Sequence, residues 1–137
     1  YQGEERVLGG IARVVGIAAR VEAFLGDMGP VYAATDVVLG RAGAMTCAEL
    51  TALGLPSILV PYPFAADDHQ RHNAEVLVRA GAATMILDRD LDGERLATAL
   101  RAMLGDPRRH AAMAAAARAL GRPQAAEQVA AECLAIL

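Results

Sequence analysis

The sequence has few of the features that mark several large classes of protein. It contains no tryptophan, and aromatic residues make up only 4% of its 137 residues. Its two cysteines, Cys47 and Cys133, have neither the spacing of a metal site nor the density of a disulfide-stabilised fold, so a reducing cytoplasm is the expected compartment. Charged residues account for 21% and the net charge is −3, which argues against nucleic acid as a partner, since that needs a basic surface.

Long apolar runs are also missing from the sequence. None approaches the roughly 18 residues that a membrane-spanning helix requires. The length is that of one domain with a sizeable core. Because the chain begins with Tyr1 and opens on YQGEERVLGG, we expect it to be a fragment of a longer protein.

Short apolar runs alternate with stretches that have helical character. Hydrophobic residues make up 55% of the chain and the mean hydropathy is +0.30, as in parallel sheets covered on both faces. The pattern predicts an α/β fold, a Rossmann-like parallel sheet with helices on both faces. The expected strands are 19–24, 36–39, 57–60 and 83–87, and the expected helices are 4–14, a short one ending near Ala34 that Asp27 caps, 45–53, 68–80 and a helical tail over about 92–137.

The stretch GRAGAMTCAE, residues 40–49, joins an expected strand to an expected helix. Gly40 and Gly43 would let the backbone turn sharply and approach a ligand. The first N–H groups of the helix would then face an anion such as phosphate, with the Thr46 hydroxyl adding a hydrogen bond. Glu49 lies on the same helix face and suits a pair of sugar hydroxyls. The alternative is an ordinary glycine turn followed by a solvated glutamate.

A second polar cluster, DDHQRHN, spans residues 67–73 after another expected strand. Asp67 or Asp68 would cap the helix that begins there. Three neutral polar side chains would form one helix face that suits a sugar: His69, Gln70 and Asn73. A capped helix with an ordinary polar first turn is the alternative, and a zinc site that includes His72 lacks the usual ligand spacing.

Groups for catalysis are not evident beside these binding groups. The sequence has no Ser-His-Asp spacing, no paired catalytic carboxylates and no P-loop lysine. Cys47 is expected to pack in the core because no histidine partner is evident, and His110 to be solvated. We therefore expect no catalytic residue and no metal site in this chain.

The clusters belong to stretches that together resemble a known enzyme family. The stretches are GIAARVEAFLGDM, YAATDVVLGRAGAMTCAELTALGLPSILVPYPFAADDHQRHNAEVLVRAGAATMIL and the AAARAL tail. They are similar to the donor-binding half of the bacterial peptidoglycan N-acetylglucosaminyltransferases. These hexosyltransferases transfer N-acetylglucosamine from its UDP sugar, without a cofactor, to undecaprenyl-diphospho-muramoyl-pentapeptide, converting lipid I to lipid II. The resemblance implies a GT-B fold, with two facing Rossmann-like domains, of which residues 1–137 would be one partial UDP-sugar-binding domain.

The resemblance also implies a role for individual residues. The turn before the helix would embrace the diphosphate and reach the sugar, and Glu49 would accept hydrogen bonds from the ribose. His69 and Gln70 would contact the N-acetylglucosamine, with Asn73 in support. The uracil would lie against the loop from Phe24 to Met28. The implied substrate-binding residues are Leu25, Met28, Arg41, Gly43, Ala44, Met45, Thr46, Glu49, His69, Gln70 and Asn73.

The chain departs from the family in two ways. Leu25, Gly26 and Asp27 stand where the family usually has isoleucine and two acidic residues, so the base pocket is expected to be looser. The first strand of the donor domain, with its glycine- and serine-rich loop, has no counterpart here, which would leave a sheet edge exposed. The acceptor half has none either, and in the family that half carries the membrane-binding patch and the general base. We therefore expect the isolated chain to be inactive, and the complete enzyme to be cytoplasmic or on the cytoplasmic face of the bacterial inner membrane.

Other interpretations of the same residues differ in the partner protein, in the acceptor, or in whether the domain belongs to an enzyme. A stand-alone UDP-sugar-binding subunit would need a separate membrane-anchored partner, as in the split eukaryotic transferase that adds the second sugar of the dolichol-linked oligosaccharide. A related antibiotic or lipid glycosyltransferase of the GT-B fold would use another acceptor. A non-enzymatic Rossmann-like domain is disfavoured because Gly43, Thr46, Glu49 and Gln70 are all present.

Overall fold

The computed structural model describes residues 18 and 20–136 and divides the chain into two units, Tyr1–Ala34 and Thr35–Leu137. In the described part of the first unit, helix α2 spans Gly29–Ala33, with Pro30 in its first turn. The Asp27 carboxylate accepts the N–H of Gly29 at 2.9 Å, one position before the N-cap residue Met28. Asp27 therefore supports the start of this helix, as the sequence predicted. The helix expected over 4–14 lies outside the described residues.

The strand expected over 19–24 is wrong for its described residues. Residues 20–24 contain no strand. Arg20 Nε and Glu22 Oε1 lie 2.7 Å apart, so these alternate side chains do share one side of the chain. An isolated extended segment is nevertheless not a strand, because its backbone groups need a paired neighbour.

The second unit contains a three-stranded parallel sheet in the order β1-β2-β3. The strands are β1 Val38–Gly40, β2 Ser57–Leu59 and β3 Ala83–Met85. Leu39 pairs with Ile58, and Ile58 with Thr84. Three of the expected strands are thus confirmed, each shorter than predicted, and their carboxyl ends meet at one edge of the sheet.

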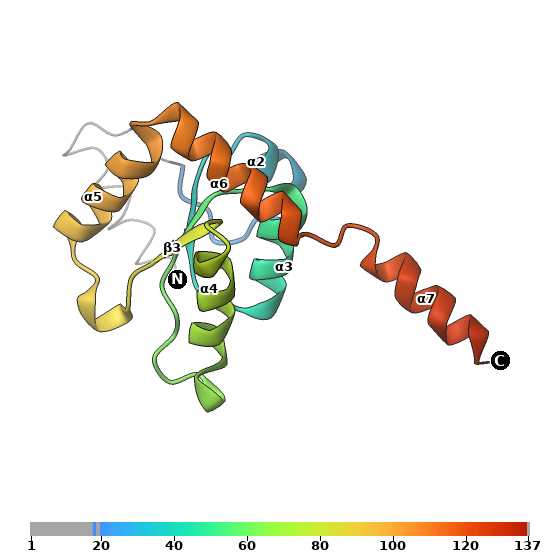
Figure 1. Cartoon of the computed structure of the whole chain (residues 1–137). Helices are drawn as coiled ribbons and strands as arrows, with labels where there is room; N and C mark the ends of the chain where they lie inside the picture. The colour runs from blue at the N-terminus through green and yellow to red at the C-terminus, as the bar shows by residue number, and fades with distance from the viewer. Residues whose placement is uncertain (1–17, 19, 137) are drawn as a thin grey trace. The chain divides into compact units, whose positions relative to one another are not determined.

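Helices connect and follow the strands (Figure 1). Helix α3, Ala44–Leu53, joins β1 to β2, and helix α4, His69–Arg79, joins β2 to β3. Two short 3-10 helices lie after the last two strands, η1 Ala66–Asp68 and η2 Asp88–Asp90. The chain then continues only in helices, as expected: α5 Gly93–Leu104, α6 Pro107–Leu120 and α7 Ala125–Ala135.

The middle strand forms the centre of the core. Ser57, Ile58 and Leu59 are all 0% exposed. Because successive side chains of a strand point to opposite faces, both faces of the sheet are covered at β2. Ile58 packs against Met103 of α5 and Met113 of α6. This arrangement is the doubly wound α/β fold that the sequence predicted.

Glycine and aspartate set most of the helix ends. Gly54 (φ 69°) closes α3 and Gly81 (φ 78°) follows α4, both in the left-handed region that favours glycine. The Asp92 side chain accepts the N–H of Arg95 at 2.7 Å, and Asp106 caps α6 in the same manner.

The expected side-chain cap of α4 by Asp67 or Asp68 is wrong. Asp68 is the N-cap residue, but its side chain caps no N–H group. Asp67 and Asp68 both have left-handed backbones (φ 50° and 52°), whereas a capping side chain needs an extended backbone at this position. The Asp68 carboxylate instead lies 3.6 Å from Arg71.

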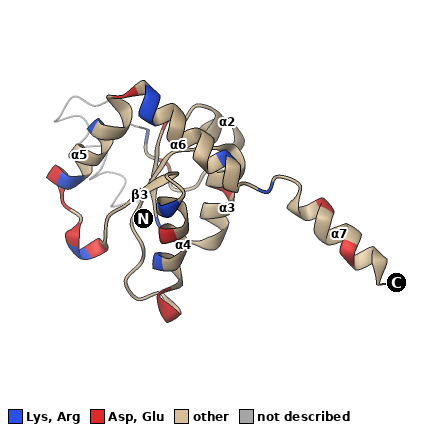
Figure 2. Ribbon diagram, in the orientation of Figure 1, with Lys and Arg blue, Asp and Glu red and all other residues tan. Residues whose placement is uncertain are grey.

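Oppositely charged residues lie close together on two parts of the described surface. Figure 2 shows arginine and acidic residues next to each other on α4 and around η2 and the start of α5. Arg71 pairs with Glu75 at 3.0 Å, and Arg95 with Asp90 at 3.4 Å. Of the helices that the structure describes, none combines the length and apolar character needed to cross a membrane.

Candidate functional site

The turn after β1 places the first turn of α3 at the carboxyl edge of the sheet. Ala42 is fully buried, which anchors the turn, and Gly43 is the N-cap residue of α3. The Gly43 carbonyl accepts the N–H of Cys47 at 2.9 Å. The first N–H groups of an α-helix have no acceptor within the helix, and the helix dipole adds partial positive charge there. The turn can therefore hold an anionic group at the strand ends.

Gly40 and Gly43 act differently from the prediction. The positive-φ glycines of the described chain are Gly54 and Gly81, and Gly43 has φ −64° and ψ 151°, which any residue can adopt. The expected conformational reason for these two glycines is therefore wrong. A Cβ at Gly40 would meet no atom within 4 Å, and one at Gly43 only Thr46 Oγ1 at 3.8 Å. What both glycines leave is open space for the close approach of a ligand.

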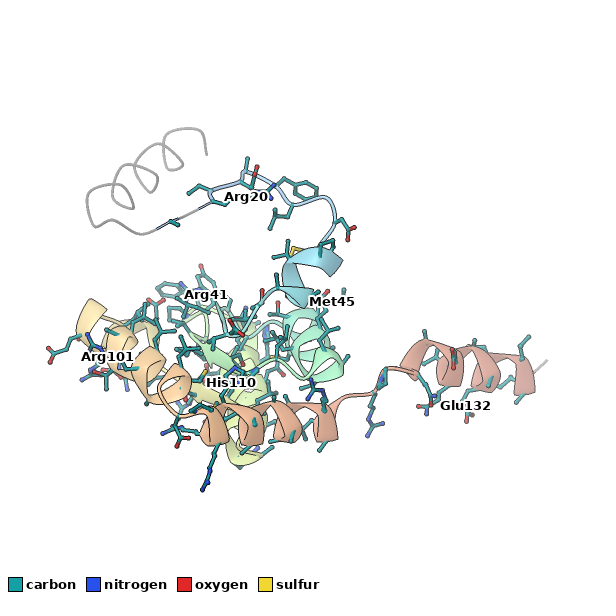
Figure 3. The ribbon with its side chains drawn as sticks, turned by 90° about the horizontal axis from the view of Figure 1, so that it is seen from above. Arg20, Arg41, Met45, Arg101, His110 and Glu132 are labelled. Carbon is teal, nitrogen blue, oxygen red and sulfur yellow. The ribbon has the colours of Figure 1, made fainter. Side chains whose placement is uncertain are left out.

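Thr46 and Glu49 both lie on α3 beyond this turn. Thr46 is half-buried in the first helical turn, and Glu49 is exposed three residues later on the same face. Met45 also projects from the first turn and is 77% exposed (Figure 3). An anion at the helix start would thus have a hydroxyl beside it and a carboxylate one turn away.

The polar residues at the start of α4 already hold backbone groups of the site. His69 Nδ1 lies 2.7 Å from the carbonyl of Ala66, which can only accept, so the Nδ1 nitrogen donates and Nε2 of the neutral ring is an acceptor. Gln70 Oε1 accepts the N–H of Tyr62 at 3.0 Å, which leaves its NH2 group as the donor for a ligand.

Asn73 joins the two predicted clusters directly. Its Nδ2 donates to the carbonyl of Ala42 at 3.0 Å, from α4 to the turn after β1. The structure therefore brings the glycine turn and the start of α4 together at one rim, as expected from the two strand ends. His72 is exposed, and among the described residues no three His, Cys, Asp or Glu side chains gather closely enough to hold a metal ion.

Arg41 links the ends of all three strands. From the turn after β1, its Nη1 donates to the carbonyls of Val60 and Pro61, each at 3.2 Å, and to Asp88 Oδ1 at 2.6 Å. Its guanidinium carbon also lies 5.6 Å from the centre of the Tyr62 ring, within cation–π range. Arg41 was expected to contact substrate, and the structure additionally gives it this set of internal contacts.

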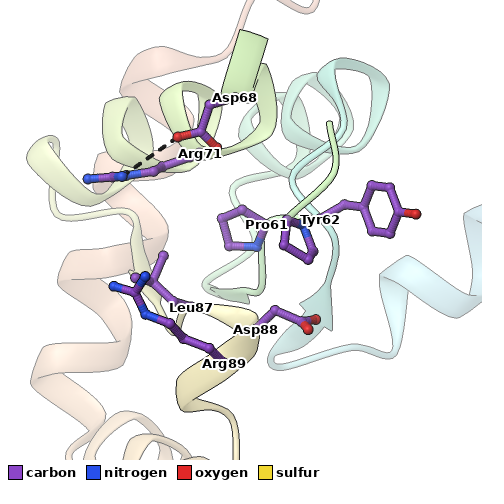
Figure 4. A pocket seen from close by; sticks show the side chains of 8 residues that line it. Pro61, Tyr62, Asp68, Arg71, Leu87, Asp88 and Arg89 are labelled. Atoms are coloured by element: carbon purple, nitrogen blue, oxygen red, sulfur yellow. Dashed lines mark ion pairs between the residues drawn. The ribbon is translucent and has the colours of Figure 1, made fainter. Parts of the chain in front are cut away.

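Asp88 and Tyr62 contact candidate site residues at this rim, and the sequence analysis did not single them out. Both follow strands, and residues after the strands of a parallel sheet meet at its carboxyl edge. The same argument from the strand ends could therefore have identified Asp88, which follows the third strand. A pocket of about 270 Å³ opens beside them (Figure 4). It is lined by Pro61, Tyr62, Pro63, Asp68, Arg71, Leu87, Asp88 and Arg89.

Cys47 was expected to pack in the core and His110 to be solvated, and the structure supports the first expectation more than the second. Burial raises the pKa of the Cys47 thiol above its ordinary value, which keeps it protonated at neutral pH and fits the expected packing role. His110 is half-buried, and its Nε2 lies 2.8 Å from the carbonyl of Asp36. His110 is thus less solvated than expected, and its ring also connects α6 to the residues that precede β1.

Leu25 and Met28 belong to the first unit, before α2. Their side chains are 36% and 37% exposed, and Phe24 beside them is 85% exposed. An exposed apolar group of this kind suits a flat aromatic ligand such as a base. Their expected place against uracil stays a prediction.

The fold and the rim define an open parallel α/β domain whose candidate ligand-binding groups lie at the carboxyl ends of the strands. The family described as glycosyltransferase family 28 C-terminal domain matches residues 8–129. The chain therefore belongs to glycosyltransferase family 28 and carries its C-terminal domain. This confirms the resemblance and the Rossmann-like fold that the sequence predicted.

Relatives and a solved structure agree with this assignment. Proteins named UDP-N-acetylglucosamine–N-acetylmuramyl-(pentapeptide) pyrophosphoryl-undecaprenol N-acetylglucosamine transferase are 51% identical in Anaeromyxobacter sp. (strain K), over 91% of this chain, and 50% identical in Methylococcus capsulatus, over 86%. A crystal structure of MurG from Acinetobacter baumannii superposes with a TM-score of 0.74 at 34% identity, covering 82% of this chain and 34% of that one. The chain spans about a third of the length of both curated relatives, 33% in each case.

Proposed function

We propose that this chain is the donor-binding domain of a hexosyltransferase that transfers N-acetylglucosamine from UDP-N-acetylglucosamine to undecaprenyl-diphospho-muramoyl-pentapeptide in peptidoglycan synthesis. The observation that carries the proposal is the 51% identity, over 91% of the chain, to a relative whose name states that transfer. The rim described above supports it, because it offers groups suited to each part of a nucleoside-diphosphate sugar.

The diphosphate is proposed to lie at the start of α3. The backbone N–H groups of Ala44, Met45 and Thr46 belong to the first helical turn and would donate to phosphate oxygens, with the Thr46 hydroxyl beside them. The open space at Gly40 and Gly43 would admit the phosphates close to the backbone. Glu49, one turn along α3, would accept hydrogen bonds from the ribose hydroxyls.

The sugar is proposed to lie against the start of α4. His69 Nε2 would accept from a hydroxyl, and the Gln70 NH2 group would donate to an oxygen of the sugar. Asn73 would support the site by holding the carbonyl of Ala42, 3.0 Å away. Leu25 and Met28 would cover the uracil.

These groups would bind and stabilise the leaving UDP without presenting the attacking hydroxyl. Preorganised donors on the diphosphate lower the barrier as negative charge develops on the leaving group. The acceptor, its general base and any peripheral contact with the cytoplasmic face of the membrane are proposed to belong to an acceptor domain. No metal or cofactor is proposed for the donor site.

Calorimetry with UDP, UDP-N-acetylglucosamine, UDP-glucose and ADP tests the proposal on the 137-residue chain. We expect UDP and UDP-N-acetylglucosamine to bind, ADP to bind at least about tenfold more weakly, a difference of about 1.4 kcal/mol, and a chelator to have no effect. Equal affinity for ADP, or binding that disappears with the chelator, would contradict it. Preference for UDP-glucose over UDP-N-acetylglucosamine would favour a related GT-B transferase of different donor specificity.

A further inference from the structure

Three loops meet at one arginine side chain on the rim of the sheet. Arg41 comes from the turn after β1, the carbonyls of Val60 and Pro61 come from the loop after β2, and Asp88 comes from η2 after β3. The shortest of the contacts is the ion pair to Asp88, at 2.6 Å. Charge-assisted hydrogen bonds are stronger and better directed than neutral ones, so Asp88 fixes the orientation of the guanidinium more firmly than either carbonyl does.

The turn that contains Arg41 is also fixed by contacts of the next residue, Ala42. Ala42, the next residue, is fully buried, and its carbonyl accepts the side-chain amide of Asn73 at 3.0 Å. The loop after β2 is in turn tied to α4, because the N–H of Tyr62 donates to Gln70 at 3.0 Å. The position of the first turn of α3 therefore depends on contacts at both Arg41 and Ala42.

We propose that Asp88 is a positioning residue of the donor site, which orders the diphosphate-binding turn through Arg41 without touching the donor. This inference rests on the proposed function, since it concerns the site that would bind the UDP diphosphate. Asp88 lines the pocket together with Pro61 and Tyr62 (Figure 4), and no residue of α3 is among the described residues that line it.

The proposal predicts whether loss of the Asp88 carboxylate strengthens or weakens UDP binding. If Arg41 served only to attract phosphate, removal of the neighbouring carboxylate would strengthen UDP binding, because the guanidinium would lose its competing anion. If Asp88 orders the turn, its removal weakens binding, since the first N–H groups of α3 are then less well placed before the ligand arrives.

The test compares UDP with UMP on the 137-residue chain and its variants. UDP and UMP share the base and ribose and differ by one phosphate, so the ratio of their dissociation constants reports on the diphosphate site. For Asp88→Ala we expect UDP to bind at least about threefold more weakly, within the range of an exposed ion pair, with a smaller loss for UMP. Asp88→Glu keeps the charge and should restore most of the ratio.

Asp90→Ala is the matched control, because Asp90 lies on the same 3-10 helix and pairs with Arg89 and Arg95 rather than Arg41. It should leave both dissociation constants unchanged. Unchanged or tighter UDP binding by Asp88→Ala, an equal loss for UDP and UMP, or an equal effect of Asp90→Ala would overturn the positioning role and leave the proposed function intact. If the unaltered chain fails to bind UDP at all, the proposed function is overturned and this inference with it.

Discussion

Glu49 is the residue on which the proposed recognition of the nucleoside depends most. It is exposed on α3, one turn beyond the residues proposed to hold the diphosphate. A carboxylate that accepts two hydroxyl hydrogen bonds gains about 1.5–3 kcal/mol from each. We therefore expect Glu49→Ala to weaken UDP binding at least about tenfold while the free energy of unfolding changes little. Calorimetry and urea titration measure the two quantities.

A ribose analogue separates this role from a general effect of charge. Because 2′-deoxy-UDP lacks one of the two hydroxyls, Glu49→Ala should weaken its binding less than it weakens that of UDP. Glu132→Ala removes an exposed carboxylate from α7 and serves as the matched control. An equal loss for UDP and the deoxy analogue would show that Glu49 does not recognise the 2′-hydroxyl.

For individual residues, the sequence predicted which side chains lie on one helix face better than it predicted their hydrogen-bond partners in other segments. Thr46 and Glu49 were placed on one helix face by spacing alone, and α3 bears this out. The contacts of Asn73 to Ala42 and of Arg41 to Asp88 join residues 31 and 47 positions apart. Spacing within one segment carries no information on such contacts, because they depend on which strand ends become neighbours in the sheet. His110, tied to Asp36 across 74 positions, was missed for the same reason.

Among the features of the elements, the helix ends depend most on local chemistry. Gly54, Gly81, Asp92 and Asp106 act through their own backbone or a residue two or three positions away, so local chemistry suffices. The expected strand over 19–24 failed at residues 20–24 because a strand also needs a partner, which no local pattern supplies. The capping role of Asp68 failed because its backbone is left-handed, which the identity of the residue does not dictate.

Gly54 and Gly81 offer a matched pair for testing what a left-handed helix end costs. A Cβ at Gly81 would meet no atom within 4 Å, so Gly81→Ala adds only backbone strain of about 1–2 kcal/mol. A Cβ at Gly54 would in addition clash with the Arg118 side chain of α6, whose Nε would lie 2.6 Å away. We expect Gly54→Ala to lower the free energy of unfolding more than Gly81→Ala does, as measured by urea titration.

Truncation of the arginine isolates the steric part of this difference. In an Arg118→Ala background, the cost of Gly54→Ala should fall to that of Gly81→Ala, because the clash is removed while the backbone strain remains. If the two glycine substitutions cost the same in the unaltered chain, the Arg118 side chain adjusts freely and adds no steric cost at Gly54.

For the whole molecule, activity of the chain by itself depends on whether it supplies the acceptor site and the general base in addition to the proposed donor site. Transfer of a sugar needs an acceptor hydroxyl held in line with the leaving group and a base that takes its proton. In the proposed arrangement Glu49 faces the ribose and His69 faces the sugar, so neither is placed to be that base. The chain also spans about a third of the length of its curated relatives, 33% of the Anaeromyxobacter protein.

We therefore expect the 137-residue chain to bind UDP-N-acetylglucosamine without transferring the sugar. The assay follows turnover of UDP-N-acetylglucosamine onto a lipid-linked muramoyl-pentapeptide acceptor, with the heat-denatured chain as the blank. The chain alone should not exceed the blank, and addition of a separately produced acceptor domain should restore turnover. Glu49→Ala should then lower the restored rate at limiting donor, because it weakens donor binding. Sustained turnover by the chain alone would mean that it supplies its own base and acceptor site, contrary to the proposed division between the two domains.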